Sequence, residues 1–336
     1  MKLNLIAEKF IGTANGVYTA YLESVESIKK INDIELTVNG KGDNYDVVHS
    51  HTIGFEYILK SFKYKNKLLV SAHVVPDSFI GSLILSELWR PMAKWYLKYV
   101  YSRARMIIAV SPVVKTELEK IGIKTEINVL CNSVNRVKFK ADNESRDKFR
   151  QKLNIKKEDF VVLCVGQIQP RKGIYDFLEA AKNLKDIIFV WVGGRPYGKL
   201  TADFNSLTTA VENAPKNVIF TGAVDFDDMP SYYAMADVYF MPSFQENFAF
   251  ATIEASSVKL PLVLRDNVEY PSSLFTHYLK GKNATDFTEI IKKLFGDREF
   301  FKKWQIESDT LASKYEISSY MKQLVSYYKK VADENK

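Results

Sequence analysis

Short apolar runs that alternate with amphipathic stretches of helical period are the feature that most limits the fold of this 336-residue chain. Runs such as Leu68–Ala72 and Phe160–Val165 are almost wholly apolar, so we expect strands that are buried on both faces of a sheet. Strands of this kind, separated by helices, are typical of parallel sheets built from β-α-β units. The expected strands are residues 3–7, 46–49, 68–72, 106–110 and 127–131, then 160–165, 187–192, 218–221, 237–241 and 261–264.

Two sets of five strands predict an α/β protein with two Rossmann-like, doubly wound domains. The chain length fits this division, because single domains commonly have roughly 150 residues. We expect an N-terminal domain over residues 1–150, a C-terminal domain over residues 151–315, and a helix over residues 316–336 that packs back on the N-terminal domain. The charged stretch 142–159 is expected to carry the linker between the domains.

The sequence offers no membrane-spanning helix, because no window approaches about 18 uncharged apolar residues. Residues 1–10 are typical of a strand and lack the longer apolar region of a signal peptide. Cys131 and Cys164 lie in or beside apolar runs, which indicates buried thiols and neither a disulfide nor a metal framework. We therefore expect a cytoplasmic protein, free or peripheral on the inner face of the cell membrane.

The net charge of +7 is confined to the first half of the chain. Residues 1–150 hold 23 Lys and Arg against 16 Asp and Glu, whereas the remainder holds 24 of each. A one-sided basic surface favours an anionic partner, either nucleic acid or an acidic lipid surface. The alternative is an ordinary solvated face.

The segment 79–105 combines aromatic rings with basic residues in an amphipathic pattern. Such a pattern suits a lipid headgroup interface, with rings at the boundary and cations on anionic lipid. We expect Pro91 to break or kink this helix. The alternative is that the rings belong to the core of an ordinary helix. The residues expected to contact the membrane or the acceptor are Trp89, Arg90, Lys94, Trp95, Lys98, Arg103 and Arg105.

Three strands of the second half end in glycine-bearing turns. Gly166 precedes Gln167, Gly194 precedes Arg195, and Gly222 follows the third strand. Because the carboxyl ends of parallel strands meet at one edge of a sheet, these turns are expected to converge on one crevice.

Cations accompany two of these turns, with Arg171 and Lys172 after the first and Arg195 after the second. Arginine and lysine at such positions suit a diphosphate. Taken together, the turns and the cations predict a site for a nucleoside diphosphate.

Two carboxylates flank the start of a helix expected over residues 247–256. Glu246 closes the turn from strand to helix, and Glu254 lies eight residues on, about two helical turns away. The backbone N–H groups after Glu246 suit phosphate oxygens, and Glu254 suits the two ribose hydroxyls. Spacing alone is weak evidence, since two helical glutamates usually mark a solvated face.

The order of these pieces resembles the retaining family-4 glycosyltransferases of GT-B fold, and the resemblance covers nearly the whole chain. That fold has two Rossmann-like domains that face each other across a cleft. The resemblance rests on the glycine turns and both glutamates, together with Ala109-Val110-Ser111, Asn132-Ser133-Val134-Asn135 and Phe139.

The resemblance assigns Glu246, His73, Lys172 and Arg171 to catalysis. Lys172 would bind the donor diphosphate, Glu254 the ribose, and Glu246 and His73 the donor sugar. The loop from Gly12 to Gly16 would meet donor and acceptor. The donor-binding residues implied in this way are Gly16, Gly166, Gln167, Gly194, Arg195, Val224, Asn247, Phe248, Ala249 and Glu254.

The chain departs from the family at several turns. Gln167 stands where an arginine is usual, so Arg171 is expected to supply the charge. Ala249 and Lys259 stand where glycines are usual, and Leu264-Arg265-Asp266-Asn267 replaces a turn with two glycines.

The departures point to a subfamily, the bacterial glycosyl-diacylglycerol glycosyltransferases and diglucosyl-diacylglycerol synthases above all. The stretches similar to that subfamily are His73–Phe79, Gln245-Glu246-Asn247-Phe248 and Leu264-Arg265-Asp266-Asn267. This similarity implies transfer of a hexose from a UDP-sugar to a glycolipid such as monoglucosyl-diacylglycerol, and glucose is the hexose that we expect. The reaction would pass through an oxocarbenium-like transition state. No acidic triplet for a metal ion is apparent, so we expect no bound metal and no other cofactor.

Two alternatives remain open. The acceptor would instead be diacylglycerol itself, a soluble sugar, or a capsule or lipopolysaccharide intermediate. A more distant alternative is a basic nucleic-acid-binding protein, although no DNA- or RNA-binding motif appears and we expect no nucleic-acid partner.

His49 and His51 form a conceivable metal pair, but without accompanying ligands they are expected to line the cleft between the domains.

Overall fold

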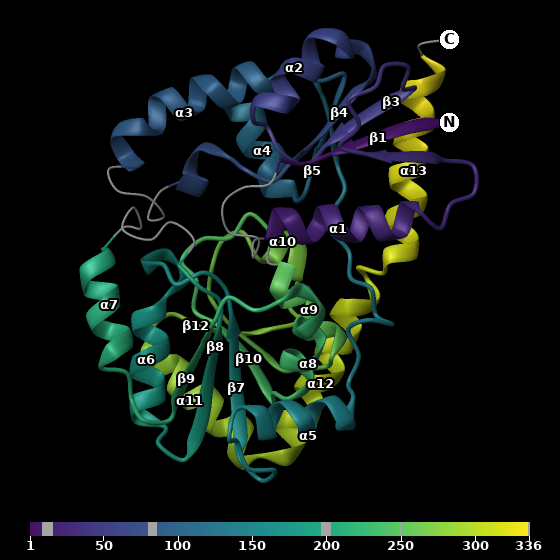
Figure 1. The fold of residues 1–336 in the computed structure, drawn as a ribbon. Coiled ribbons are helices and arrows are strands. Elements are labelled where there is room, and N and C mark those ends of the chain that lie inside the picture. Colours follow the sequence, from purple (N-terminus) through teal and green to yellow (C-terminus); the bar gives the residue numbers. More distant parts are fainter. Residues whose placement is uncertain (9–15, 80–85, 196–202, 249, 335–336) are drawn as a thin grey trace. The chain divides into compact units, whose positions relative to one another are not determined.

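The computed structural model describes residues 1–8, 16–79, 86–195, 203–248 and 250–334. Within this range the chain forms two compact units. The first unit contains residues 1–79 and 86–133 and the C-terminal residues from 317 on, and the second contains residues 134–316. Figure 1 shows the elements of each unit.

The first unit is a six-stranded parallel sheet in the order β2-β1-β3-β4-β5-β6. Its strands are β1 (Lys2–Ile6), β2 (Glu35–Val38), β3 (Val47–Ser50), β4 (Leu68–Ala72), β5 (Met106–Ala109) and β6 (Glu126–Val129). Its helices are α1 (Gly16–Ile28), α2 (Phe55–Lys63), α3 (Ser86–Tyr101), α4 (Pro112–Lys120) and α13 (Ile317–Asp333), with 3₁₀ turns η1 (Lys65–Lys67) and η2 (Pro76–Phe79).

The second unit is also a six-stranded parallel sheet, in the order β12-β11-β10-β7-β8-β9. Its strands are β7 (Phe160–Val165), β8 (Ile187–Val192), β9 (Val218–Gly222), β10 (Val238–Met241), β11 (Leu262–Arg265) and β12 (Leu279–Gly281). Its helices are α5 (Asn143–Lys152), α6 (Ile174–Asn183), α7 (Phe204–Glu212), α8 (Met229–Ala234), α9 (Phe250–Ser257), α10 (Pro271–Leu274), α11 (Ala284–Gly296) and α12 (Arg298–Ser313), with 3₁₀ turns η3 (Pro170–Lys172) and η5 (Phe226–Asp228).

The predicted α/β fold is confirmed, and each of the ten expected strands is present to within one or two residues at either end. The prediction missed β2 and β12, which are edge strands of the two sheets. An edge strand pairs on one side only and can stay short and partly exposed, so it lacks the continuous apolar run of a central strand. β2 has no fully buried residue, and β12 is only three residues long.

Aromatic side chains fill the core of the second unit. The ring of Phe177 on α6 meets the buried Trp191 of β8 edge to face, with ring centroids 5.0 Å apart. The same ring stacks on Phe240 of β10 at 5.8 Å. These contacts hold α6 against β8 and β10, and they thereby fix the positions at which the turns after those strands begin.

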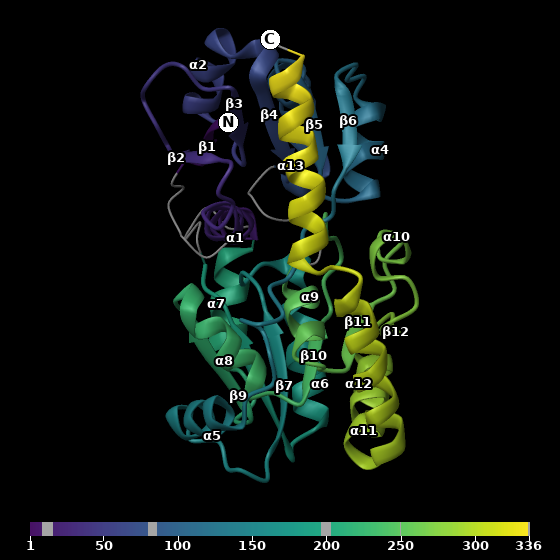
Figure 2. The same ribbon diagram turned by 90° about the vertical axis from the view of Figure 1, so that its right-hand side faces the viewer.

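The C-terminal helix α13 covers the sheet of the first unit (Figure 2). Its buried residues recur every three or four positions, at Tyr320, Leu324, Tyr328 and Val331, as expected for one apolar face of a helix. This is the packing that we predicted for the last helix. None of the described helices is both long enough and apolar enough to cross a bilayer.

The boundary between the two units lies between Ser133 and Val134 and not at residue 150 as predicted. Phe139 and Phe149 are buried in the core of the second unit, and α5 packs on α8. The charged composition of residues 142–159 suggested a linker, but its apolar minority is sufficient to fix this stretch to the second unit.

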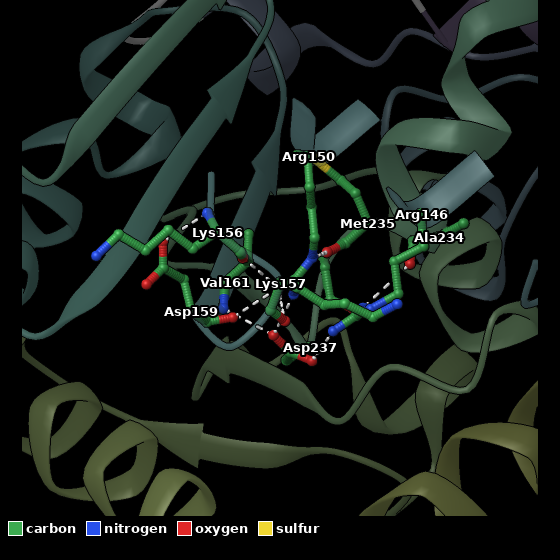
Figure 3. A network of polar contacts seen from close by, with 10 residues as sticks. Arg146, Arg150, Lys156, Lys157, Asp159, Val161, Ala234, Met235 and Asp237 are labelled. Carbon is green, nitrogen blue, oxygen red and sulfur yellow. Dashed lines mark hydrogen bonds and ion pairs between the residues drawn. The ribbon is translucent and has the colours of Figure 1, made fainter. Parts of the chain in front are cut away.

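Arg150 fastens α5 and the following turn to the start of β10 (Figure 3). Its guanidinium is almost fully buried, and it donates to the backbone oxygens of Met235, Lys156, Lys157 and Asp159 at 2.8–3.1 Å. It also pairs with Asp237 at 2.9 Å. One side chain thereby donates to four backbone carbonyls and to a carboxylate that also pairs with Arg146.

We expect Arg150→Met to destabilise the second unit by about 1.5 to 3 kcal/mol, because it removes the hydrogen bonds that a buried charged donor makes to Asp237 and to four carbonyls. The measurement is the urea midpoint of the second unit's unfolding. Lys148→Met, at an exposed position on the same helix, is the matched control and should change the midpoint little. Equal midpoints for both variants would contradict the assigned role of Arg150.

Candidate active site

The loops expected to form a site follow the two strands at which the order of the second sheet reverses. From β7 the chain proceeds to β8 and β9 on one side, and it then crosses to β10 on the other side. Ligands of open α/β sheets bind outside the carboxyl ends of the strands at such a switch point. Lys172 follows β7 and Glu246 follows β10, so the strand order brings these two residues together.

Backbone packs on backbone where β7 and β8 end. Gly193 has a φ of +140°, and a Cβ placed there would lie 2.1 Å from the carbonyl oxygen of Gly166. Only glycine fits this approach, which explains why a glycine follows β8. Trp191 adds a hydrogen bond from its indole nitrogen to the same oxygen at 2.8 Å.

Lys172 and Glu246 form an ion pair of 2.5 Å between two side chains that are each only about one-tenth exposed. Burial lowers the pKa of Lys172 against the attraction of Glu246. Burial alone would raise the pKa of Glu246, but the charges of Lys172 and Arg171 outweigh it and hold that pKa below its ordinary value. The carboxylate is therefore ionised at neutral pH.

Arg171 joins the same two loops. Its Nη1 donates to the carbonyl of Gln245 at 3.2 Å, while its own carbonyl accepts from the backbone nitrogen of Phe244 at 2.8 Å. Its Nε donates to Gln169, whose amide reaches Gln167 at 2.9 Å. The charge that we expected from Arg171 is thus linked by hydrogen bonds to Gln167, the position where an arginine is usual.

Glu254 occupies a different environment on α9, where it is 4% exposed. Tyr233 of α8 donates its hydroxyl to Oε2 of Glu254 at 2.5 Å. Burial raises the pKa of Glu254 to about 8, although the Tyr233 hydrogen bond and the charge of Lys138 act against that rise. The protonated form of Glu254 therefore predominates at neutral pH.

The helix that carries Glu254 begins at Phe250, three residues later than predicted, so Glu246 lies in the preceding loop. The residues between them are held individually. Asn247 accepts from the amide of Gln245 at 3.1 Å, and the ring of Phe248 meets Tyr315 edge to face. Ala249 lies outside the described residues.

Other predicted donor residues are less closely associated with the ion pair. Arg195 donates to Thr208 and Leu207 of α7. Gly194 lies against Ala223, and Val224 packs on the core of the second unit.

In the first unit, Gly16 is exposed at the start of α1. Residues 12–15, which belong to the same predicted loop, lie outside the described part of the chain.

The histidines of the first unit form a cluster with one another. His73, at the end of β4, places Nε2 3.3 Å from Nδ1 of His51. The two rings of His49 and His51 are 4.7 Å apart, and His49 contacts Tyr328 of α13 at 2.7 Å and Ser71 at 2.9 Å. Burial lowers the pKa of His73 to about 4 and that of His49 to about 3, so both rings are neutral at pH 7.

His49 and His51 were expected to line the cleft between the domains. Both are buried, and their recorded hydrogen-bond partners belong to the first unit. Among the described residues, no group of three or more His, Cys, Asp or Glu is arranged to hold a metal ion.

The predicted aromatic and basic segment divides between core and surface. In α3, Leu97, Val100 and Tyr101 are buried, whereas Trp95 is 68% exposed and stacks on the partly exposed Tyr99. The helix is continuous from Ser86 to Tyr101 and contains Pro91, so the expected break is absent. Arg90, Lys94 and Lys98 are exposed, and the side chain of Trp89 is outside the described part.

Arg103 connects α3 to a second exposed apolar stripe, which lies on α2 and includes Phe62. Its guanidinium lies 3.9 Å from the ring centroid of Phe62 and 5.4 Å from that of Tyr99. Arg105 instead pairs with Glu126 and Glu334 within the first unit, and thus belongs to the packing of α13. The surface formed by α2 and α3, called the aromatic-basic face below, contains Phe55, Leu59, Phe62, Met92, Trp95 and Tyr99 with Arg90, Lys94, Lys98 and Arg103.

Tyr233 and Gln169 are parts of the site that the sequence pattern did not predict. Nothing near Tyr233 in the sequence signals its partner Glu254, 21 residues on. Gln169 is fully buried between Gln167 and Arg171, and an alternation of polar residues in that turn is the one signal that was available.

Two doubly wound units, with a lysine, an arginine and glycine turns at the switch point of the second sheet, define a glycosyltransferase of the GT-B architecture. The profile of group 1 glycosyltransferases matches residues 145–309, and that of glycosyltransferase family 4 matches residues 27–138. A processive diacylglycerol alpha-glucosyltransferase of Acholeplasma laidlawii is 30% identical over 83% of this chain and 83% of its own length. The chain therefore belongs to this family of glycosyltransferases and is an enzyme of the hexosyltransferase class.

Other relatives agree with this assignment. The alpha-galactosylglucosyldiacylglycerol synthase of Streptococcus pneumoniae is 29% identical over 99% of this chain and 90% of its own length. Among solved structures, Anabaena Alr3699/HepE in complex with UDP and glucose superposes with a TM-score of 0.77 at 16% identity. That superposition covers 97% of this chain and 99% of the Anabaena chain, and it supports the fold.

The raised pKa of Glu254 predicts a pH-dependent stability. The folded protein binds this proton more tightly than the unfolded chain does, so stability should fall as pH rises from about 4.5 to about 8. Glu254→Gln keeps an acceptor for Tyr233 and removes the titration. Relative to this variant, the wild type should lose unfolding free energy with a slope of at most about 1.4 kcal/mol per pH unit. Parallel curves for the two proteins between pH 5 and pH 8 would contradict the raised pKa.

Proposed function

We propose that this enzyme transfers a hexose, glucose in the first instance, from a UDP-sugar to a diacylglycerol-type glycolipid at a membrane surface, with retention of anomeric configuration. Relatives that match most of the chain include a diacylglycerol glucosyltransferase and a galactosylglucosyldiacylglycerol synthase. Monoglucosyl-diacylglycerol is the acceptor that fits the resemblance of the sequence.

The observation that carries the proposal is the buried pair of Lys172 and Glu246 at the switch point of the second sheet. In this proposal Lys172 and Arg171 bind the donor diphosphate, and Glu246 contacts the sugar. Glu254 accepts hydrogen bonds from the ribose hydroxyls, and Tyr233 orients its carboxyl group. His73 of the first unit contacts the donor sugar as a neutral imidazole.

Lys172 and Arg171 would act where negative charge develops. As the bond between the anomeric carbon and the phosphate oxygen breaks, the sugar becomes oxocarbenium-like and the diphosphate gains charge. Fixed cations in a site of low dielectric stabilise that charge without reorganisation. The acceptor oxygen forms the new bond, and its proton passes to the departing phosphate oxygen. The positive charge at the leaving group is supplied by these side chains, and we propose no bound metal.

The aromatic-basic face is proposed to bind anionic lipid. On α2, Phe55, Leu59 and Phe62 recur at the spacing of one helix face and are 74%, 54% and 66% exposed. A water-exposed apolar stripe flanked by cations matches the requirements of an interfacial helix. Each lysine or arginine near an anionic surface contributes about 1 kcal/mol, which gives reversible, peripheral binding.

The proposed reaction is tested with purified protein in mixed micelles that contain anionic lipid. Labelled UDP-glucose or UDP-galactose is offered with diacylglycerol or monoglucosyl-diacylglycerol, and organic-phase products are separated by chromatography. We expect labelled diglycosyl lipid from UDP-glucose and the monoglucosyl acceptor. Lys172→Ala should form it on the order of a hundredfold more slowly, since a charge that stabilises the transition state is lost.

A product from diacylglycerol alone would change the acceptor but keep the class. A donor that binds while no lipid is labelled would overturn the lipid acceptor in favour of a soluble or cell-surface sugar intermediate. An acceptor of that kind is suggested by another relative, a putative teichuronic acid biosynthesis glycosyltransferase of Bacillus subtilis, which is 26% identical over 58% of this chain.

Membrane binding is tested separately by sedimentation with vesicles of phosphatidylglycerol or of phosphatidylcholine. The double variant Phe62→Ser and Trp95→Ser should weaken binding to the anionic vesicles by about tenfold or more, because each buried ring contributes about 1.5 to 3 kcal/mol. Ile306→Ser removes an apolar side chain that is 67% exposed on α12 and serves as the matched control. Equal sedimentation of both variants would contradict the assigned face.

A further inference from the structure

Arg265, at the end of β11, fastens two loops of the second unit to each other. The residue is only 8% exposed. Its Nε donates to the carbonyl of Pro242 at 2.8 Å, in the loop between β10 and α9. Its Nη2 pairs with Asp176 in the first turn of α6, and its Nη1 donates to the carbonyl of Lys282 at 2.6 Å, just after β12.

A second side chain and an aromatic ring complete this arrangement. Asn267 donates its amide to the carbonyl of Ser243 at 2.8 Å and is itself 8% exposed. The Arg265 guanidinium also stacks over the ring of Phe244, 3.8 Å from its centroid. Two consecutive carbonyls and the next ring of the loop from Pro242 to Glu246 are thus held from β11.

The loops so joined are those that carry Lys172 and Glu246. Asp176 lies four residues after Lys172, and Pro242 lies four residues before Glu246. Arg265 joins Asp176 to Pro242, and the ion pair joins Lys172 to Glu246. The two chain segments, 172–176 and 242–246, together with these two connections form a closed circuit.

The middle of the circuit is closed by backbone packing. Gly173 has a φ of +75°, and a Cβ there would lie 2.2 Å from the carbonyl oxygen of Pro242. The same carbonyl therefore meets Gly173 and accepts from Arg265, so a change at Arg265 acts on the contact between the loops. A displacement of Pro242 would be transmitted along this loop toward Glu246, four residues further on.

We propose that Arg265, with Asn267, is a positioning residue that sets the place of Glu246 and thereby the affinity for the sugar half of the donor. This inference rests on the proposed function, in which Glu246 contacts the sugar. The ribose contact is proposed for Glu254, whose partner Tyr233 lies on α8. The ribose and the sugar therefore depend on different supports, and Arg265 belongs to the second. Lys172, which is proposed to bind the diphosphate, also lies on a loop that Arg265 joins.

Arginine is the side chain that this position requires. Its planar guanidinium directs three donors to fixed places and presents a flat face to Phe244. A lysine has a single ammonium on a flexible stem, so it reaches one or two of the three acceptors. We therefore expect Arg265→Lys to keep part of the positioning of Glu246 and Arg265→Met to lose almost all of it.

The test compares the affinities of UDP and UDP-glucose, measured by isothermal titration calorimetry, for the wild type, Arg265→Met, Arg265→Lys and Asn267→Ala. Arg265→Met should weaken UDP-glucose by about ten- to a hundredfold, the scale of a small misplacement of a binding group. UDP should weaken less than UDP-glucose, because its proposed ribose contact, Glu254, lies outside the loops that Arg265 joins, whereas its proposed diphosphate contact, Lys172, lies within them. Asn267→Ala should act in the same direction, and Arg265→Lys should recover part of the loss.

Arg146→Met is the matched control, because Arg146 is a partly buried arginine of the same unit that bonds to Asp237, Ala234 and Ala236. It should weaken neither ligand selectively, even if its melting temperature falls. A parallel loss of UDP and UDP-glucose in Arg265→Met, or no loss in a folded variant, overturns the inference. A wild type that binds neither ligand overturns the proposed donor as well, which distinguishes the two failures.

Discussion

The buried ion pair of Lys172 and Glu246 is the interaction on which the second unit's site depends. Removing two charges from water is costly, and their mutual attraction often does no more than offset that cost. The pair is therefore weak evidence for stability, whereas its position at the switch point of a sheet favours a functional role. In the proposed reaction, the donor diphosphate is a second anion that pairs with Lys172. The buried ammonium therefore has a negatively charged partner both before and after the donor binds.

The strand order explains why this pair forms at all. Lys172 and Glu246 are 74 residues apart, yet they follow β7 and β10, which are neighbours in the sheet. The first sheet reverses in the same way between β1 and β3. His51 follows β3. Lys172 and Glu246 in the second sheet and His51 in the first thus lie beside a switch point, where doubly wound sheets bind their ligands.

The central strands were predictable because they are buried on both faces and therefore apolar throughout. The same logic failed where burial is one-sided, as in β2, and where charge hides a core contact, as around Phe149. The glutamates and Lys172 were found because turns at strand ends carry a recognisable chemistry. Tyr233 and Arg265 were not found as partners, since their contacts depend on tertiary packing that no local spacing encodes.

The two glutamates illustrate this limit most clearly, because they are the same residue type with opposite behaviour. Both are removed from water, yet the neighbouring cations hold the pKa of Glu246 below its ordinary value, while burial raises that of Glu254 to about 8. Environments that separate the pKa values of two carboxyl groups also separate their roles. At neutral pH the two glutamates together contribute about one negative charge, beside the positive charges of Lys172 and Arg171, so the local charge around the proposed diphosphate stays positive. A second ionised carboxylate would oppose the binding of a dianion, so the protonation of Glu254 is consistent with a site for a nucleoside diphosphate.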